Sequence, residues 1–210
     1  MDNADPGPPR AAAATPAAAP RPASHEAGRD GAADDDALVA AYLDGDVHAF
    51  ETLYRRHKDP LYRFFVRQLP AATAQDAFQD TWLKLVDALP TYKAQERFAA
   101  YLFAIAHNVL NDHHRRQMRS PEQSEPEVEH PATTPGSEMD HEQAELRARL
   151  HELVRALPLN QRTVWLLRQE TDLSLQQIAR LTRSSVEGAK SRLRYARETL
   201  KAGMQRYVRQ

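Results

Sequence analysis

The sequence predicts an all-α protein with two small helical domains joined by a flexible linker. Apolar residues recur at the three- and four-residue spacing of helices, strand-like alternation is absent, and only 7 of 210 residues are glycine. Residues 1–33 are rich in alanine and proline, and residues 120–145 carry four prolines and eight carboxylates, so neither stretch has a helical apolar face. We therefore expect a disordered tail over 1–33, a helical domain over 34–119, an acidic linker over 120–145 and a second helical domain over 146–210.

The first helical domain is predicted to begin with apolar residues spaced over 38–65, in a pattern that continues past Pro60. A second helix is expected over 74–88, and Pro90 ends it. A third helix is expected over 96–116, because its apolar residues are spaced by four, three and four positions. This buried face consists of Phe98, Leu102, Ile105 and Val109.

The opposite side of the third helix carries a mixed polar and aromatic face. At about 100° per residue, six side chains fall within a sector of roughly 60°: Arg97, Tyr101, Asn108, Asp112, Arg115 and Arg119. An aromatic ring stacks on an unpaired base while amides and guanidiniums bind base edges and phosphates, so this face suits partly single-stranded nucleic acid. The alternative is a solvated helix face with one half-buried tyrosine.

The second helical domain carries the clearer motif. Asn160 is expected to cap one helix, and Ser174 with Gln177 forms the pattern of a capping box ahead of a short helix. A turn over 182–184 then leads to Ser185, which is expected to cap the last helix. The apolar positions of that helix are Val186, Ala189, Leu193, Ala196 and Leu200. A basic stripe beside them consists of Lys190, Arg194, Arg197 and Lys201.

A short helix, a tight turn and a second helix with a basic flank predict a helix-turn-helix, whose second helix enters the major groove of DNA. The alternative is a helical hairpin with a solvated basic face. Charge favours the first interpretation, because residues 146–210 carry 14 basic and 5 acidic side chains. The net charge of −1 for the whole chain conceals this excess, since the linker adds 8 carboxylates and no lysine or arginine. The asymmetry indicates a polyanion as the partner of the C-terminal domain.

Composition disfavours several other classes of protein. Without cysteine there is no disulfide framework, thiolate zinc site or cysteine nucleophile. No run approaches the ~18 apolar residues of a membrane span, so we expect a cytoplasmic protein that is not inserted into a membrane. His107, His113 and His114 suggest a metal-dependent nuclease, but their spacing suits chelation poorly. We therefore expect no catalytic residue, no metal site and no cofactor.

These motifs, in this order, make the chain resemble bacterial RNA polymerase sigma factors of the extracytoplasmic-function (ECF) type, whose two conserved helical domains are regions 2 and 4 of the sigma-70 family. The resemblance covers nearly all of residues 35–203. It departs at Tyr101, where the family usually has tryptophan, and in the turn 182–185, which lacks the family's glycine. His107 occupies the arginine position of the family's Ala-Arg-Asn pattern. The matching residues are Asp76, Gln79, Asp80, Trp82, Ala106, Asn108, Asp112, Arg115, Ala156, Leu157, Pro158, Arg162, Lys190, Arg192 and Arg194.

The resemblance implies an alternative sigma factor, not an enzyme, that binds core RNA polymerase and directs promoter-specific transcription initiation. Its implied partners are core RNA polymerase, promoter DNA and an anti-sigma factor. The implied polymerase-binding residues are Asp76, Gln79, Asp80 and Trp82. The implied −10 element residues are Arg97, Tyr101, Asn108, Asp112, Arg115 and Arg116. The implied −35 element residues are Ser185, Glu187, Lys190, Ser191, Arg192, Arg194 and Arg197.

A helix-turn-helix regulator that binds operator DNA without core polymerase is the alternative function. Such a regulator would need a ligand-binding or phosphoacceptor domain within residues 34–119, where the sequence pattern indicates helices and no βα receiver. Binding to core polymerase distinguishes the two functions.

Overall fold

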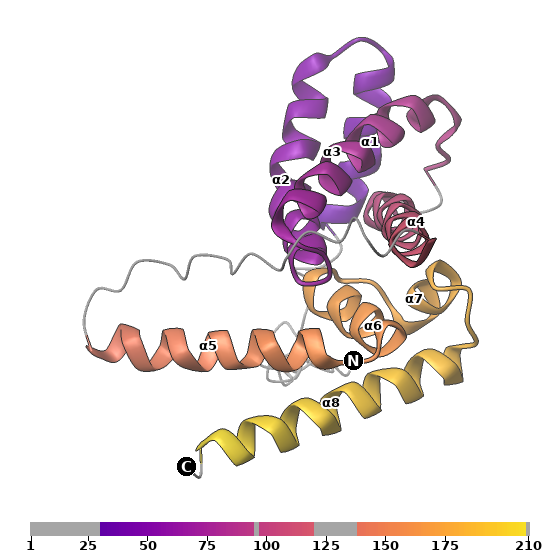
Figure 1. Cartoon of the computed structure of the whole chain (residues 1–210). Helices are drawn as coiled ribbons and strands as arrows, with labels where there is room; N and C mark the ends of the chain where they lie inside the picture. The colour runs from indigo at the N-terminus through magenta and orange to yellow at the C-terminus, as the bar shows by residue number, and fades with distance from the viewer. Residues whose placement is uncertain (1–29, 95–96, 120–137, 209–210) are drawn as a thin grey trace, which may run out of the picture.

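The computed structural model describes residues 30–94, 97–119 and 138–208, which are mostly helical (Figure 1). Strands are absent from these described residues, and the predicted all-α class is confirmed. The elements are α1 (Asp30–Leu43), α2 (Val47–Val66), α3 (Ala71–Ala88), the short 3₁₀ helix η1 (Leu89–Thr91), α4 (Phe98–Arg119), α5 (Glu138–Ala156), α6 (Leu159–Glu170), α7 (Leu175–Leu181) and α8 (Val186–Val208).

Two helices begin earlier than the predicted domain boundaries. α1 begins at Asp30, inside the stretch 1–33 predicted as a tail, and α5 begins at Glu138, inside the stretch 120–145 predicted as a linker. The end of the predicted linker contains no proline, and carboxylates near a helix N-terminus are favoured by the helix dipole. Acidic composition alone therefore does not prevent a helix there. The rest of the predicted tail and linker lies outside the described residues: 1–29 and 120–137.

Helices α1 to α4 pack around a core of leucine and aromatic side chains. α2 begins after Asp46, whose carboxylate accepts a hydrogen bond from the backbone N–H of His48 at 2.9 Å. The helix continues through Pro60, as its apolar pattern predicts. α2 meets α4 in the core, where the ring centroids of Phe64 and Phe103 lie 5.6 Å apart. The buried face of α4 is formed by Phe98, Leu102, Phe103, Ala106, Val109 and Leu110.

Helices α6, α7 and α8 pack on one another, and α5 lies along α8 (Figure 1). The predicted capping box of α7 is confirmed, because Ser174 Oγ accepts from the N–H of Gln177 while Gln177 Oε1 accepts from the N–H of Ser174 at 2.9 Å. The cap predicted at Asn160 is wrong. Pro158 adopts the extended N-cap conformation, so α6 begins at the next residue and Asn160 lies in its first turn.

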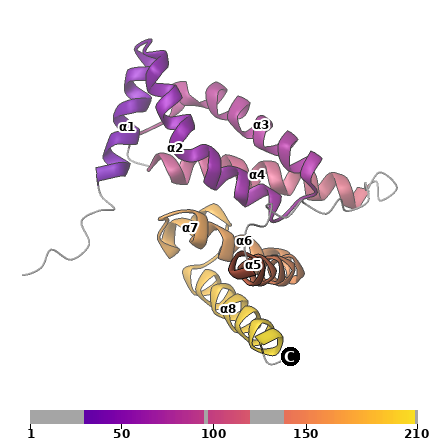
Figure 2. The same ribbon diagram turned by 90° about the vertical axis from the view of Figure 1, so that its left-hand side faces the viewer.

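The first group of helices, α1 to α4, packs directly against the second group, α5 to α8. Figure 2 shows α1 to α4 together, α6 and α7 beneath them and α8 farther away. α2 contacts α6, and α4 contacts α7. Buried apolar side chains from both groups belong to one continuous cluster, which extends from Val39 to Leu200. The polar face of α4 therefore lies close to the second group of helices.

Candidate nucleic-acid interface

The start of α8 is fixed by a serine cap. Ser185 Oγ accepts a hydrogen bond from the N–H of Gly188 at 3.0 Å, and the Ser185 carbonyl accepts from the N–H of Ala189 at 2.9 Å. The predicted cap at Ser185 is thus confirmed. The small and apolar side chains of α8 are turned inward and are buried: Ala189, Leu193, Ala196 and Leu200.

Burial of that face turns the predicted basic stripe outward. Lys190, Arg194 and Arg197 are exposed on α8, and Glu187 is exposed one turn before Lys190. The ion pair between Lys190 Nζ and Glu187 has an N–O distance of 3.7 Å, and the pair between Arg194 Nε and Glu198 has one of 4.0 Å. Exposed pairs of this kind contribute little free energy. Phosphates therefore compete easily for these cations.

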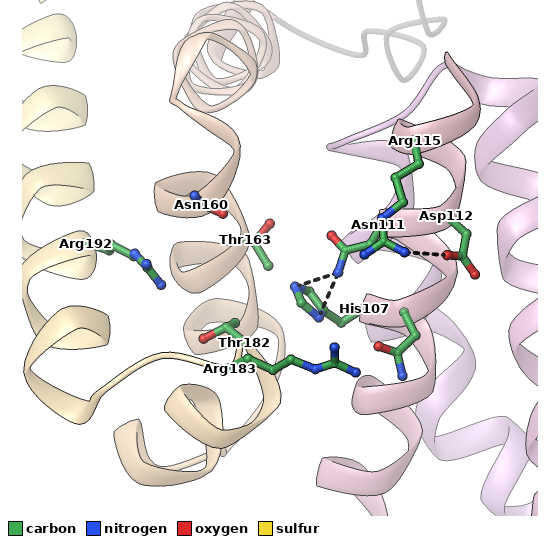
Figure 3. Close-up of a pocket in the computed structure, with 10 residues that line it drawn as sticks. His107, Asn111, Asp112, Arg115, Asn160, Thr163, Thr182, Arg183 and Arg192 are labelled. Atoms are coloured by element: carbon green, nitrogen blue, oxygen red, sulfur yellow. Dashed lines mark hydrogen bonds and ion pairs between the residues drawn. The ribbon is translucent and has the colours of Figure 1, made fainter. Parts of the chain in front are cut away.

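Two residues predicted to contact the −35 element lie away from the exposed stripe. Ser191 and Arg192 are half-buried. Figure 3 shows the Arg192 side chain on the side of α8 that faces α6 and α7, in the lining of a cavity. Because Arg192 is two positions from both Lys190 and Arg194, it points to the other side of the helix.

The turn between α7 and α8 contains the one non-glycine residue with positive φ among the described residues. Arg183 has φ of 51°, at the place where the chain lacks a glycine. Hydrogen bonds hold the turn: among them, the N–H of Ser184 donates to the Ala179 carbonyl at 2.8 Å, and Thr182 Oγ1 donates to the Ile178 carbonyl at 2.8 Å. These contacts keep the two helices of the helix-turn-helix at a fixed angle despite the strained residue.

The polar face of α4 is accessible. Asn108 is exposed, and the side chains of Arg115 and Asp112 are 69% and 48% exposed, with 3.6 Å between Arg115 Nη1 and Asp112 Oδ1. Arg116 is also exposed. Amide, carboxylate and guanidinium groups are therefore available along one side of the helix, where they suit the edges and phosphates of an unpaired strand.

The two residues at the start of this face are placed differently from the rest. Arg97 is exposed and precedes α4, and its carbonyl accepts from the N–H of Ala100 at 2.8 Å. Tyr101 is half-buried; its hydroxyl donates to the Ala88 carbonyl at 3.2 Å and its ring centroid lies 5.0 Å from that of Tyr92. Tyr101 thus joins α4 to the end of α3. For this residue, the structure agrees with the alternative interpretation of the α4 face, in which its tyrosine is half-buried.

A polar cavity of about 390 Å³ lies between α4 and the second group of helices (Figure 3). Its α4 wall includes three of the predicted −10 residues: Asn108, Asp112 and Arg115. Its other lining residues are His107, Asn111, Asn160, Thr163, Thr182, Arg183 and Arg192. No local sequence pattern relates the α4 residues to the other lining residues from Asn160 onward, which lie forty-five or more positions away along the chain.

Electrostatics inside the cavity keep one histidine neutral. Burial, and secondly the Arg183 guanidinium, lower the pKa of His107 to about 4. Asn111 Nδ2 lies 3.3 Å from His107 Nδ1, within hydrogen-bonding distance. The imidazole is therefore uncharged near pH 7, so the positive charge of the cavity comes from the arginines.

The predicted polymerase-binding residues on α3 differ in their solvent exposure. Asp76 and Gln79 are exposed, Asp80 is half-buried and Trp82 is buried. The Trp82 ring packs 4.8 Å from that of Tyr54, measured between centroids, so it supports the surface from within. Leu83, which the sequence analysis missed, is 66% exposed. Leu83 lies four positions after Gln79, and this spacing in the sequence places the two side chains on one face of the helix.

In the described part of the chain, no three histidine, cysteine, aspartate or glutamate side chains are arranged to hold a metal ion. Among its helices, none has the length and apolar character needed to cross a membrane.

Two family models match the sequence. Sigma-70 region 2 matches residues 53–120, and Sigma-70, region 4 matches residues 147–200. The RNA polymerase sigma-H factor of Pseudomonas aeruginosa is 29% identical over 189 residues, which cover 84% of this chain and 96% of that protein. The ECF RNA polymerase sigma factor SigC of Mycobacterium tuberculosis is 29% identical over 182 residues, with 81% and 93% coverage.

Two solved structures share the fold. CnrH, solved in complex with the cytosolic domain of CnrY, has a TM-score of 0.59 and 24% identity, and the match covers 80% of this chain and 96% of CnrH. The sigma factor RpoE, solved with the anti-sigma factor NepR from Bartonella quintana, has a TM-score of 0.62 and 20% identity, with 76% and 98% coverage.

Proposed function

The chain belongs to the sigma-70 family and directs transcription initiation as an alternative sigma factor, and we propose that α4 and α8 divide its promoter recognition between them. One observation carries the proposal. The polar face of α4 lies within the region 2 match, and the exposed cationic face of α8 lies within the region 4 match. Each half of the chain therefore presents one surface suited to nucleic acid.

We propose that α8 binds the −35 element as duplex DNA. Its first turn presents Ser185 and Glu187 to base edges, as the N-terminal residues of a recognition helix do. Lys190, Arg194 and Arg197 form phosphate contacts, which position the helix without reading sequence. The half-buried Ser191 and Arg192 support this surface rather than contact DNA directly.

We propose that α4 binds the −10 element after its bases unpair. Asn108 and Asp112 offer hydrogen-bonding groups to base edges, while Arg115 and Arg116 attract the phosphates. Tyr101 contributes by fixing the start of α4 on α3, because its hydroxyl is already bonded to the Ala88 carbonyl.

We propose that the exposed face of α3 contacts core polymerase. Asp76, Gln79 and Leu83 lie on one side of the helix, with the half-buried Asp80 at the edge of that face. An exposed leucine beside an amide and a carboxylate combines apolar burial with directional hydrogen bonds. Trp82 acts from the core by holding α3 against α2.

The partners and the compartment follow from this role. We propose an anti-sigma factor as a further partner, since RpoE, whose fold the chain shares, was solved with one. We propose that the protein works in the cytoplasm, where core polymerase meets DNA, and that it catalyses no reaction itself.

Reconstitution with core polymerase tests the proposed function. The purified chain is mixed with core polymerase and genomic fragments, and run-off transcripts are sequenced. We expect transcripts that begin downstream of one shared pair of −10 and −35 sequences, and none from core polymerase alone. Selection of the same fragments by the chain without polymerase, with no transcription, would contradict the assignment.

A further inference from the structure

The cavity between α4 and the second group of helices has an excess of positive charge. Arg115, Arg183 and Arg192 line it, whereas Asp112 is its one carboxylate among the described residues. Asp112 Oδ1 already lies 3.6 Å from Arg115 Nη1. Within the described part of the chain, Arg183 and Arg192 form no ion pair, and His107 is uncharged near pH 7. The cavity therefore contains two guanidiniums that no described carboxylate neutralises.

Arg183 reaches this cavity from a backbone conformation that disfavours arginine. Its φ of 51° lies in the left-handed region, which glycine adopts more readily than a residue with a Cβ. A glycine would form the same turn without strain, so the turn itself does not require an arginine. Figure 3 shows the Arg183 side chain extended from the turn towards His107 on α4. Strained residues are concentrated at binding sites, where the side chain has a use.

Arg192 reaches the same cavity from α8. It is half-buried on the side of the helix that faces α6 and α7 (Figure 3). A half-buried guanidinium loses part of its hydration, and only a nearby acceptor offsets that loss. An anion in the cavity would therefore be attracted by guanidiniums from two elements, the turn that carries Arg183 and the helix that carries Arg192.

Much of the remaining lining is neutral and forms hydrogen bonds. Three asparagines contribute to it: Asn108 and Asn111 from α4, and Asn160 from α6. Each amide both donates and accepts hydrogen bonds, as the edge of a nucleobase does. The cavity volume of about 390 Å³ lies within the range of small-molecule sites, and an inorganic phosphate would leave most of it empty. A molecule that joins a phosphate to a hydrogen-bonding ring suits this lining better.

The α6 wall of the cavity is held in place by contacts with α2 and the residues that follow it. Thr163 Oγ1 of α6 donates to Gln68 Oε1 at 3.0 Å. Glu170, the last residue of α6, accepts from Arg63 Nε at 2.7 Å and from Arg67 Nη1. A site whose walls are already positioned loses less conformational entropy when a ligand binds.

We propose that this cavity binds a nucleotide, whose phosphate is bound by the cavity arginines and whose base contacts the asparagines. The guanidinium fork matches the oxygens of a phosphate group. Asn108, Asp112 and Arg115 also belong to the α4 surface proposed for the −10 strand. A bound nucleotide would therefore compete with that strand. This consequence, unlike the binding itself, rests on the proposed function.

Isothermal titration calorimetry of the full chain measures the binding without polymerase or DNA. The probes are AMP, GMP, CMP and UMP, and each is compared with its own nucleoside at constant ionic strength. Because the nucleoside lacks only the phosphate, the ratio of the two affinities reports the attraction of the arginines. We expect at least one nucleotide to bind at a single site per chain, roughly tenfold or more tightly than its nucleoside.

Two substitutions test the arginines while preserving the fold. Arg183→Gly introduces the residue that a φ of 51° favours, and Arg192→Gln keeps a long polar side chain at a half-buried position. Each should weaken nucleotide binding roughly tenfold and leave nucleoside binding unchanged. Arg180→Gln is the control, because it also removes one positive charge but lies exposed on α7, outside the cavity lining. It should keep the wild-type affinity for the nucleotide.

A DNA strand carries the same phosphate group, so a single-stranded oligonucleotide of mixed sequence is titrated as a separate ligand. If no nucleotide binds more tightly than its nucleoside, or if both arginine variants keep the wild-type nucleotide affinity, the proposal is wrong. It is also wrong if the variants lose affinity for the strand while the wild type binds no nucleotide. Failure of the proposed function is a different result, because loss of transcription with core polymerase would leave these titrations unchanged.

Discussion

Arg183 and His107 face each other across the cavity between the two groups of helices (Figure 3). Burial of the imidazole, together with the Arg183 guanidinium, lowers the pKa of His107 to about 4. The histidine is therefore uncharged near pH 7. Its protonation would place a further positive charge on a half-buried ring beside the arginines that line the cavity.

We expect the free energy of unfolding to fall as the pH drops from about 6.5 to about 4. The unfolded chain binds protons at ordinary histidines near pH 6.5, whereas folded His107 does so only near pH 4, so acid favours the unfolded state in this window. Burial lowers the pKa values of His113 and His114 in the same direction, with nearby arginines as a second cause. Urea titrations followed by circular dichroism at pH 7 and pH 5 measure the change.

His107→Gln should make this pH dependence shallower, because it removes the histidine whose pKa burial lowers to about 4. His48→Gln is the matched control, since His48 is 91% exposed and forms only a long contact with Glu51. It should keep the wild-type pH dependence. An equal loss of stability in the wild type and His107→Gln between pH 7 and pH 5 would exclude His107 as the cause.

The positive φ of Arg183 predicts a preference for glycine at that position. Left-handed backbone costs a residue with a Cβ roughly 1–2 kcal/mol, whereas glycine adopts it freely but loses more entropy on folding. We expect Arg183→Gly to be more stable than Arg183→Ala by about 1 kcal/mol in urea unfolding. Because both variants lack the guanidinium, the difference between their unfolding free energies reports the backbone contribution alone. Equal unfolding free energies would mean that the turn is not strained.

The exposed and buried side chains of α3 are expected to affect different properties: polymerase affinity and folding stability, respectively. Gln79→Ala and Leu83→Ala should weaken binding to core polymerase while leaving the unfolding free energy nearly unchanged, because both side chains are exposed. Trp82→Ala should lower that free energy by about 3–5 kcal/mol, because the ring is buried among aromatic neighbours. Fluorescence anisotropy with labelled polymerase and urea unfolding measure the two quantities. Wild-type affinity in the Gln79 and Leu83 variants would remove α3 from the polymerase interface.

Promoter opening tests the α4 surface. If Asn108 binds an unpaired base, Asn108→Ala should reduce open-complex formation by the equivalent of ~1–3 kcal/mol while leaving binding to the −35 duplex unchanged. Permanganate footprinting of the holoenzyme on its promoter detects the unpaired thymines. Met118→Ala is the control, because Met118 is 82% exposed on the same helix and outside the cavity lining. A normal footprint with Asn108→Ala argues for a merely solvated helix face.

Local structure could be predicted from the sequence where the stabilising contact is itself local. The capping box of Ser174 and Gln177 and the cap at Ser185 each lie within four residues of their partners, and both were predicted correctly. The cap at Asn160 was wrong because the nearby Pro158 already provides an extended residue before α6. A capping pattern in the sequence therefore does not decide which of two neighbouring candidate residues begins the helix.

The contacts between the two groups of helices could not be predicted in this way. Thr163 and Gln68 lie 95 positions apart, and Arg63 lies 107 positions from Glu170. No periodicity relates such residues, since their proximity depends on how complete helices pack. Helix phase also decides that Trp82 is buried while Leu83, the next residue, is exposed.

The same phase difference on α8 provides a sharp test of DNA binding in salt. Arg194 is exposed, whereas Arg192, two residues earlier, lines the cavity on the other side of the helix (Figure 3). Each phosphate contact contributes a slope of about −0.9 to the dependence of log affinity on log salt. With a −35 duplex and the full chain, Arg194→Ala should therefore weaken binding to all sequences and reduce the slope by about 1. Arg192→Ala should leave the slope unchanged although it removes the same charge. If both variants change the slope equally, general charge rather than the exposed face of α8 determines DNA binding; if neither does, the basic stripe is only a solvated surface.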